Sequence, residues 1–183
     1  MSIMSTVHRK IESDGTLHER KYARVDWHNY NVGTFFVTFS TLGKVHYFGQ
    51  IVDGVMDYSE IGQKMVEVIL NVPLHYDDVE ILRWVVMPNH IHLIVKIGSG
   101  NSSEGVIQPT QRKPIVNGCS RSRLSSLIGN LKSEVSRYTK KDGMIFGWNP
   151  RFHEHIIFDY IREKAIFDYV DNNIHKWSED CLK

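Results

Sequence analysis

The stretch Trp84–Val95 (WVVMPNHIHLIV) constrains the fold of this chain most, because it predicts two apolar β-strands joined by a tight bend at Met-Pro-Asn. In an extended strand, successive side chains alternate between the two faces. His90 and His92 therefore project to one side of the second strand, while Ile91 and Leu93 enter a core on the other side. The start of this strand offers two imidazoles to one ligand.

Strand and helix patterns alternate along the rest of the chain. Strand patterns lie at 34–39, 46–51, 79–86, 90–97 and 152–158, and helical patterns lie at 59–71, 122–139 and 162–173. Ser59 is placed to cap the first helix and Pro73 to end it. This order predicts an α+β fold, a ferredoxin-like or RRM-like antiparallel sheet with helices packed on one face.

Length and composition predict one globular domain. The chain has 183 residues, of which 42% are hydrophobic and 23% charged, enough for a single substantial core. We expect a polar leader at 1–27, one domain at 28–177 and a short tail at 178–183. Gly, Ser, Asn, Gln and Pro dominate 98–120, which predicts a flexible loop inside that domain.

Several classes of protein are disfavoured by composition. No apolar run reaches the roughly 18 residues that cross a membrane, and the first residues lack a signal-peptide core. Cys119 and Cys181 are too few for a disulfide framework. A formal net charge of +1 gives no global basic field. We expect a cytoplasmic protein that makes no membrane contact.

Basic side chains nevertheless concentrate between Arg112 and Lys141, where Glu134 is the one acidic residue. Such a run is often only the solvated face of a helix. Beside a site that handles phosphates, it becomes a candidate strip for a nucleic-acid backbone. The residues expected to contact DNA are Arg121, Arg123, Lys132 and Arg137.

The string at 87–94 (MPNHIHLI) resembles the signature of the single-tyrosine HUH transposases. In that superfamily, a histidine-hydrophobe-histidine pattern on a central strand holds a divalent metal. The histidine-triad hydrolases also alternate histidine with hydrophobic residues, but their third histidine would fall at Ile94. The wider match, from 20 to 177, is similar to the REP-associated tyrosine transposase branch. Where relatives often have proline after an Asn-Asn pair, this chain has Ile174.

The last helical pattern contributes a second part of the candidate site. Tyr169 and Asn173 are four residues apart and so share one helical face. Taken alone, they would be a packing residue and a helix end. The resemblance implies that Tyr169 is the nucleophile and that Asn173 joins His90 and His92 as the third metal ligand.

Alternatives to these residues stay open. Tyr138 and Tyr160 also lie on or near predicted helices and are competing nucleophiles. His153 and His155 repeat the two-residue spacing on a strand, which makes them a rival metal pair, although a structural or DNA-proximal role is favoured.

The resemblance implies a single-stranded DNA transposase, or strand transferase, that cuts and rejoins DNA near hairpins through a covalent phosphotyrosine. Mg²⁺ or Mn²⁺ is the expected metal, and the expected partners are hairpins of REP-like or insertion-element ends and a second copy in a homodimer. Two alternatives remain: a catalytically silent DNA-hairpin-binding protein, and a metal-dependent nuclease using water, in which Tyr169 would only pack.

Overall fold

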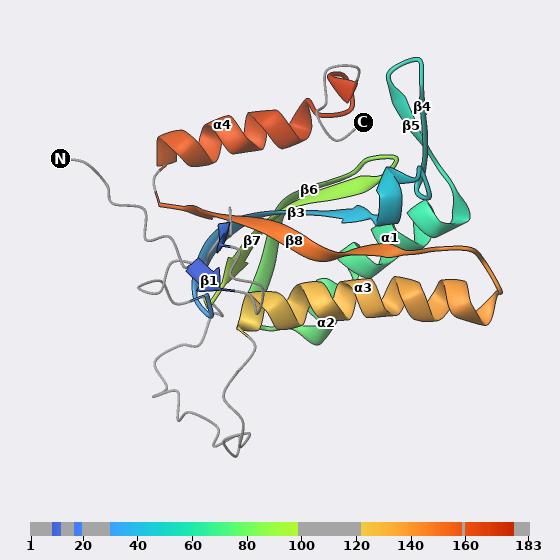
Figure 1. Ribbon diagram of the computed structural model, residues 1–183. Helices are drawn as coiled ribbons and strands as arrows, with labels where there is room; N and C mark the ends of the chain where they lie inside the picture. Colours follow the sequence, from blue (N-terminus) through green and yellow to red (C-terminus); the bar gives the residue numbers. More distant parts are fainter. Residues whose placement is uncertain (1–8, 12–16, 20–29, 99–121, 159, 178–183) are drawn as a thin grey trace.

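The computed structural model describes residues 9–11, 17–19, 30–98, 122–158 and 160–177, and Figure 1 shows its elements. Its main sheet has four antiparallel strands. In spatial order they are β6 (Val79–Val86), β7 (His90–Ile97), β3 (Gly33–Thr41) and β8 (Trp148–Ile157). If these four strands are numbered by their order in the chain, their order across the sheet is 2-3-1-4, which is the arrangement of a ferredoxin-like fold. The predicted α+β fold class is confirmed.

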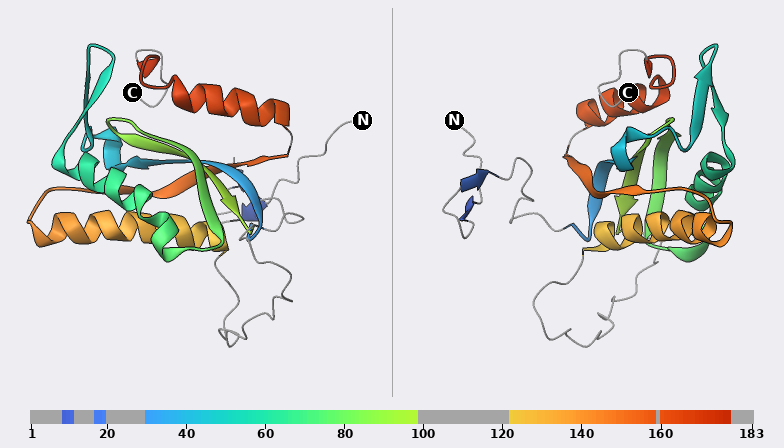
Figure 2. Two further views of the ribbon diagram at one scale, coloured as in Figure 1. Left: turned by 180° about the vertical axis from the view of Figure 1, so that it is seen from behind. Right: turned by 45° about the vertical axis from the view of Figure 1, so that its right-hand side comes forward.

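Helices cover both faces of this sheet (Figures 1 and 2). On one face lie α1 (Glu60–Leu70), α2 (Val72–His75) and α3 (Arg123–Lys141), and on the other lies α4 (Tyr160–Asp171). The sequence placed all the helices on one face. The fourth helix differs because Val170 packs against Val85, Met87 and Ile94, which project from the second face of the sheet.

Smaller elements surround the sheet. They are the paired strands β1 (Arg9–Ile11) and β2 (Leu17–Glu19), a 3-10 turn η1 (Leu42–Lys44), and a hairpin of β4 (Gly49–Val52) and β5 (Val55–Tyr58). The hairpin turns at Asp53 and Gly54, which both have positive φ. The expected loop at 98–120 and tail at 178–183 lie outside the described residues, apart from Gly98. Only 9–11 and 17–19 of the expected leader are described.

Strand β7 is buried on both faces, so two cores meet at it. Ile91, Leu93 and Val95 enter the larger core between the sheet and the helices α1 and α3. Ile94 enters the smaller core beneath α4. Each fully buried side chain of this size contributes roughly 1.5–3 kcal/mol. This packing holds the backbone of β7 in place on both sides of its two histidines.

Serine side chains cap two of the helices, and the cap at Ser59 was predicted from the sequence. The hydroxyls of Ser59 and Ser122 accept hydrogen bonds from the backbone N–H groups of Gly62 (3.1 Å) and Ser125 (3.2 Å). The helix α1 ends at Leu70, so Pro73 does not end it and lies instead in the first turn of α2. None of the helices in the described part of the chain is long and apolar enough to span a membrane.

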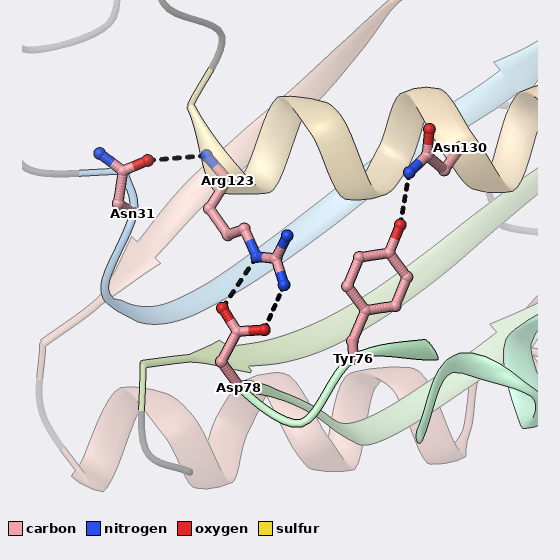
Figure 3. A network of polar contacts seen from close by, with 5 residues as sticks. All are labelled: Asn31, Tyr76, Asp78, Arg123 and Asn130. Atoms are coloured by element: carbon pink, nitrogen blue, oxygen red, sulfur yellow. Dashed lines mark hydrogen bonds and ion pairs between the residues drawn. The ribbon is translucent and has the colours of Figure 1, made fainter. Parts of the chain in front are cut away.

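A polar network fixes the start of α3 against the sheet (Figure 3). The guanidinium of Arg123 binds both carboxylate oxygens of Asp78, and the backbone N–H of Arg123 donates to Asn31 Oδ1 at 2.8 Å. The same guanidinium lies 4.8 Å from the ring centroid of Tyr76, whose hydroxyl accepts a hydrogen bond from Asn130. This network joins α3 to the segments that precede β3 and β6.

Replacing Asp78 by asparagine should lower the free energy of unfolding by about 1 kcal/mol at neutral pH, since the pair with Arg123 is two-pronged but partly exposed. The hydrogen bond from Arg123 lowers the pKa of Asp78. The stability that this carboxylate contributes is therefore present above the unfolded pKa of about 3.9 and is lost as the pH falls through the lower folded value. Urea titrations of both proteins should converge in acid, and a pH-independent difference would contradict this assignment.

Candidate active site

His90 and His92 face each other on the α4 side of β7. Their Nε2 atoms are 3.1 Å apart, and the two side chains are 0% and 2% exposed. Two nitrogen atoms at this distance are either sharing one proton or are placed to bind one ion. The prediction that both imidazoles serve one point in space agrees with this geometry.

The outer nitrogen of each imidazole is held by a neighbouring side chain. Asn89 Oδ1 lies 2.8 Å from His90 Nδ1, and Thr38 Oγ1 lies 2.7 Å from His92 Nδ1. The orientation of the Asn89 amide is fixed because its Nδ2 donates to the carbonyl of Lys44 at 3.2 Å. An amide oxygen accepts hydrogen bonds only, so His90 Nδ1 carries the proton. The lone pair of His90 is then on Nε2, directed at His92.

The charge state of His90 follows from its burial. Burial, and to a smaller degree the positive charge of Lys44, lowers the pKa of His90 to about 4. The imidazole is therefore neutral at pH 7, and neutral imidazole is the form that binds a metal ion.

Tyr169 of α4 lies over this pair. Its hydroxyl is 3.4 Å from His92 Nε2, and its ring meets the ring of His92 edge-on at 5.3 Å between centroids. Phe36 stacks on His92 at 5.2 Å and contacts the ring of Tyr169 at 6.0 Å. Tyr169 is 41% exposed, so the residue is open to solvent while its hydroxyl lies near His92.

Asn173 lies in the turn that follows α4, and its side chain is 2% exposed. Its Oδ1 is buried and has no hydrogen-bond partner among the described residues. The segment that carries it contacts both histidines, through Tyr169 at His92 and through Trp177, which stacks on His90 at 6.0 Å. A buried oxygen left without a partner costs roughly 1–3 kcal/mol. This atom is suited to a ligand.

These donors fit a divalent ion. Two imidazole nitrogens and one amide oxygen are an acceptable mixed set for Mn²⁺, and less typical for Mg²⁺. Among the described residues, no group of three His, Cys, Asp or Glu side chains is placed to bind a metal. In the described part of the chain, no His, Cys, Asp or Glu side chain therefore joins the histidine pair, and the Asn173 amide is the candidate third ligand.

Comparison with known proteins relates this geometry to a known fold. No protein-family model matches the chain. An uncharacterised protein of Haemophilus influenzae strain Rd is 29% identical over 173 residues, which is 91% of this chain and 94% of the relative. A solved REP-associated tyrosine transposase bound to a REP hairpin superposes with a TM-score of 0.56 and 21% identity, over 85% of this chain and 74% of that one. This chain has the fold of that transposase.

A structure from Deinococcus radiodurans R1, proposed to be a transposase, aligns over 84% of this chain and 94% of that one, with 14% identity and a TM-score of 0.39. That likeness is too low to carry an argument. The fold that the HUH resemblance implied is confirmed by the REP-associated transposase.

The transposase fold separates the basic helix from the histidines, because α3 lies on the opposite face of the sheet (Figure 2). Arg123 binds Asp78, and Arg137 pairs with Glu134 at 2.8 Å. The Lys132 ammonium donates to the carbonyls at 149 (2.8 Å) and 151 (3.3 Å). Arg121 lies outside the described residues. DNA contact by these four residues stays a prediction, and the structure does not bring Arg123, Lys132 or Arg137 to the histidine pair.

The structure places three of the four competing residues, which are Tyr138, His153 and His155. Tyr138 is on α3, where the ammonium of Lys64 lies 5.8 Å from its ring centroid, and the side chain of Tyr160 is outside the described set. His153 and His155 are exposed on β8, where they pair in register with Thr38 and Phe36 of β3. Of the tyrosines whose side chains are described, Tyr169 has a ring contact with the histidine pair.

Sequence reasoning missed the residues that hold the site together. Thr38 and Phe36 come from a strand far away in sequence, and Trp177 follows the last helix. Asn89 was visible as part of the bend, but its partner could not be read from spacing. A signal did exist at Thr38, since a threonine in an apolar strand pattern projects to one face and seeks a hydrogen-bond partner there.

The Lys132 environment gives a pH-dependent prediction. Burial lowers the pKa of Lys132 from 10.5 to about 8. Between these values the unfolded chain binds more protons than the folded one, so this lysine makes the free energy of unfolding rise with pH. Relative to Lys132→Met, the wild type should gain stability from about pH 8 to about pH 10.5. Denaturant unfolding across this range measures it, and a constant difference between the two proteins would exclude a lowered pKa.

Proposed function

We propose that this protein is a metal-dependent single-stranded DNA transposase, a strand transferase that cuts and rejoins DNA near hairpins through a covalent phosphotyrosine. One observation carries the proposal: the Tyr169 hydroxyl lies 3.4 Å from His92 Nε2, and the turn after the same helix buries the Oδ1 of Asn173, which has no hydrogen-bond partner in the described part of the chain. A nucleophile and a set of metal-binding atoms are thus presented together.

His90, His92 and Asn173 are the proposed ligands of Mn²⁺ or Mg²⁺. The bound ion would polarise the scissile phosphodiester and stabilise the charge that develops on it. Thr38 and Asn89 are positioning residues for this site, because each binds the outer nitrogen of one imidazole and leaves Nε2 directed inward.

Tyr169 is the proposed nucleophile. Its phenolic oxygen forms a bond to phosphorus while the bond from phosphorus to one deoxyribose oxygen breaks. The phenol, with an unperturbed pKa of about 10, loses its proton to water at its exposed edge. The leaving deoxyribose oxygen gains a proton and becomes a hydroxyl. One P–O bond replaces another, so a hydroxyl end can later attack the phosphotyrosine and rejoin the strand.

The proposed substrate is a single-stranded DNA hairpin, such as a REP-like or insertion-element end. The support is the resemblance at 87–94 together with the transposase of the same fold, which was solved bound to a REP hairpin. Assembly as a homodimer and a cytoplasmic location belong to the same proposal and rest on the resemblance and the composition.

The nucleophile is tested by incubating wild type and Tyr169→Phe with labelled single-stranded hairpin DNA and Mn²⁺ on a denaturing gel. Wild type should give a slow-migrating protein-DNA adduct, and Tyr169→Phe should lose it by at least about a hundredfold because no phenolic oxygen remains. Tyr138→Phe, on the opposite face, is the matched control and should retain the adduct. Cleavage that survives in Tyr169→Phe would instead show a nuclease using water, and binding without cleavage would show a silent hairpin binder.

The metal site gives a second test, through Mn²⁺ binding measured by titration calorimetry. Asn173→Ala removes a buried oxygen that has no partner among the described residues, so the metal-free protein should change in stability by less than about 1 kcal/mol. Its Mn²⁺ affinity should nevertheless fall at least about tenfold. Asn172→Ala, next in the chain and exposed, should bind Mn²⁺ like wild type. Equal affinities for the two variants would remove Asn173 from the ligand set.

The positioning residues give a third test with the same readout. Loss of a hydrogen bond to the outer nitrogen of a ligating histidine typically costs 10- to 100-fold in metal affinity. We expect a loss of about that size for Asn89→Ala and for Thr38→Val, with the tyrosine untouched. Unchanged affinity in both variants would show that the imidazoles are oriented by packing alone.

A further inference from the structure

The edge strand β8 places polar side chains on the same side of the sheet as the histidine pair. It pairs with β3 and is the outer strand of the sheet. Phe152 and Ile156 of β8 pack toward the larger core. Because side chains alternate along a strand, the exposed His153 and His155 project to the other side, where α4 lies, and the exposed Arg151 precedes them, next to the stretch that pairs regularly with β3 from Phe152. We call these three residues the β8 strip.

Register places the β8 strip beside the candidate site. Thr38 of β3 is paired with His92 on one neighbour and with His153 on the other, so the three form one row across the sheet. Two strand spacings separate His92 from His153, about 10 Å. His155 is paired with Phe36, whose ring contacts Tyr169 at 6.0 Å. The β8 strip therefore lies on the side of the histidine pair where β3 and β8 are, and it runs parallel to the strands.

The opposite side of the site is less suited to a phosphate chain. There α4 packs over β6 and β7, and Asp171 lies 3.6 Å from Arg83. The Arg83 guanidinium also lies 5.0 Å from the ring centroid of Phe167, so it is already engaged by α4. Glu80 adds a second carboxylate on this side, in register with Lys96. By contrast, no carboxylate alternates onto the α4 side of β8 between 151 and 157.

The chemistry of the β8 strip matches phosphate. A guanidinium binds phosphate oxygens in a two-pronged manner, and an imidazole N–H donates to them. Residues two apart on a strand are roughly 7 Å apart, so each can reach a different phosphate of an extended strand. An edge strand with one face exposed leaves room for that strand along its whole length.

We propose that the β8 strip binds the phosphate backbone of single-stranded DNA and leads it to Tyr169. This inference rests on the proposed function and assigns the DNA path to β8 rather than to α3. The occupant is an unpaired strand rather than a duplex, since the site must accept one phosphodiester at a single tyrosine.

The test is fluorescence anisotropy with a labelled oligothymidylate in buffer containing a chelator, so that no cleavage occurs. The double variant Arg151→Gln/His155→Gln should bind at least about tenfold more weakly than wild type. The slope of log affinity against log salt should become shallower by about 0.7 for each phosphate that the variant no longer neutralises. The matched control Lys140→Gln/Lys141→Gln, on exposed positions of α3, should bind within about twofold of wild type.

The β8 strip is refuted if its double variant binds oligothymidylate like wild type, or if wild type does not bind it at all. Weakening in the α3 control alone would assign the DNA path to α3. Failure of the proposed function is recognised separately, in the Mn²⁺ adduct assay at saturating hairpin DNA. If wild type forms a Tyr169-dependent adduct but the strip variant binds oligothymidylate as wild type does, the proposed function holds and the role of the β8 strip is wrong. If wild type forms no adduct, the proposed function itself is wrong.

Discussion

The rest of the site depends on two imidazoles being buried in the central strand of the sheet. A polar group taken out of water is costly unless it is hydrogen-bonded. His90 and His92 meet this requirement through Asn89 and Thr38, which bind the outer nitrogens and leave Nε2 atoms 3.1 Å apart. Because apolar residues of β7 fill the cores on both sides, the strand cannot slip by one residue without moving both imidazoles to the wrong face. The alternation of side chains along β7 thus fixes both the packing of its apolar residues and the direction in which its two histidines point.

The helix α4 and the turn after it bring further side chains to the two histidines of β7. It packs on the face that carries the histidines, away from α1 and α3, and so brings Tyr169 to His92 (Figure 1). The turn that follows it brings Asn173 and Trp177 to the same face. The proposed nucleophile and the third proposed ligand therefore come from one continuous segment, and displacement of that segment would remove both together.

The sequence predicted the features that follow from the periodic spacing of apolar residues. The alternation of residues along 90–97 predicted β7 and the shared face of His90 and His92. Helical spacing of apolar residues predicted α3 to within two residues of each end. It could not predict that α4 would lie apart from the other helices, since an amphipathic pattern shows which face of a helix is buried but not against which face of a sheet. For the same reason the charges of Arg123 and Lys132, which look exposed in sequence, bind Asp78 and backbone carbonyls on the far side of the sheet. Contacts between distant segments, such as Thr38 with His92, have no local signal.

The central claim is that Tyr169 attacks phosphorus beside His90 and His92. It is tested most directly by digesting the covalent protein-DNA adduct and locating the attached nucleotide by tandem mass spectrometry. The account predicts that the added mass lies on Tyr169, in the peptide that joins α4 to Asn173. A nucleotide found on Tyr138 or Tyr160 would contradict it, because the first lies on the opposite face of the sheet and neither has a described contact with the histidine pair.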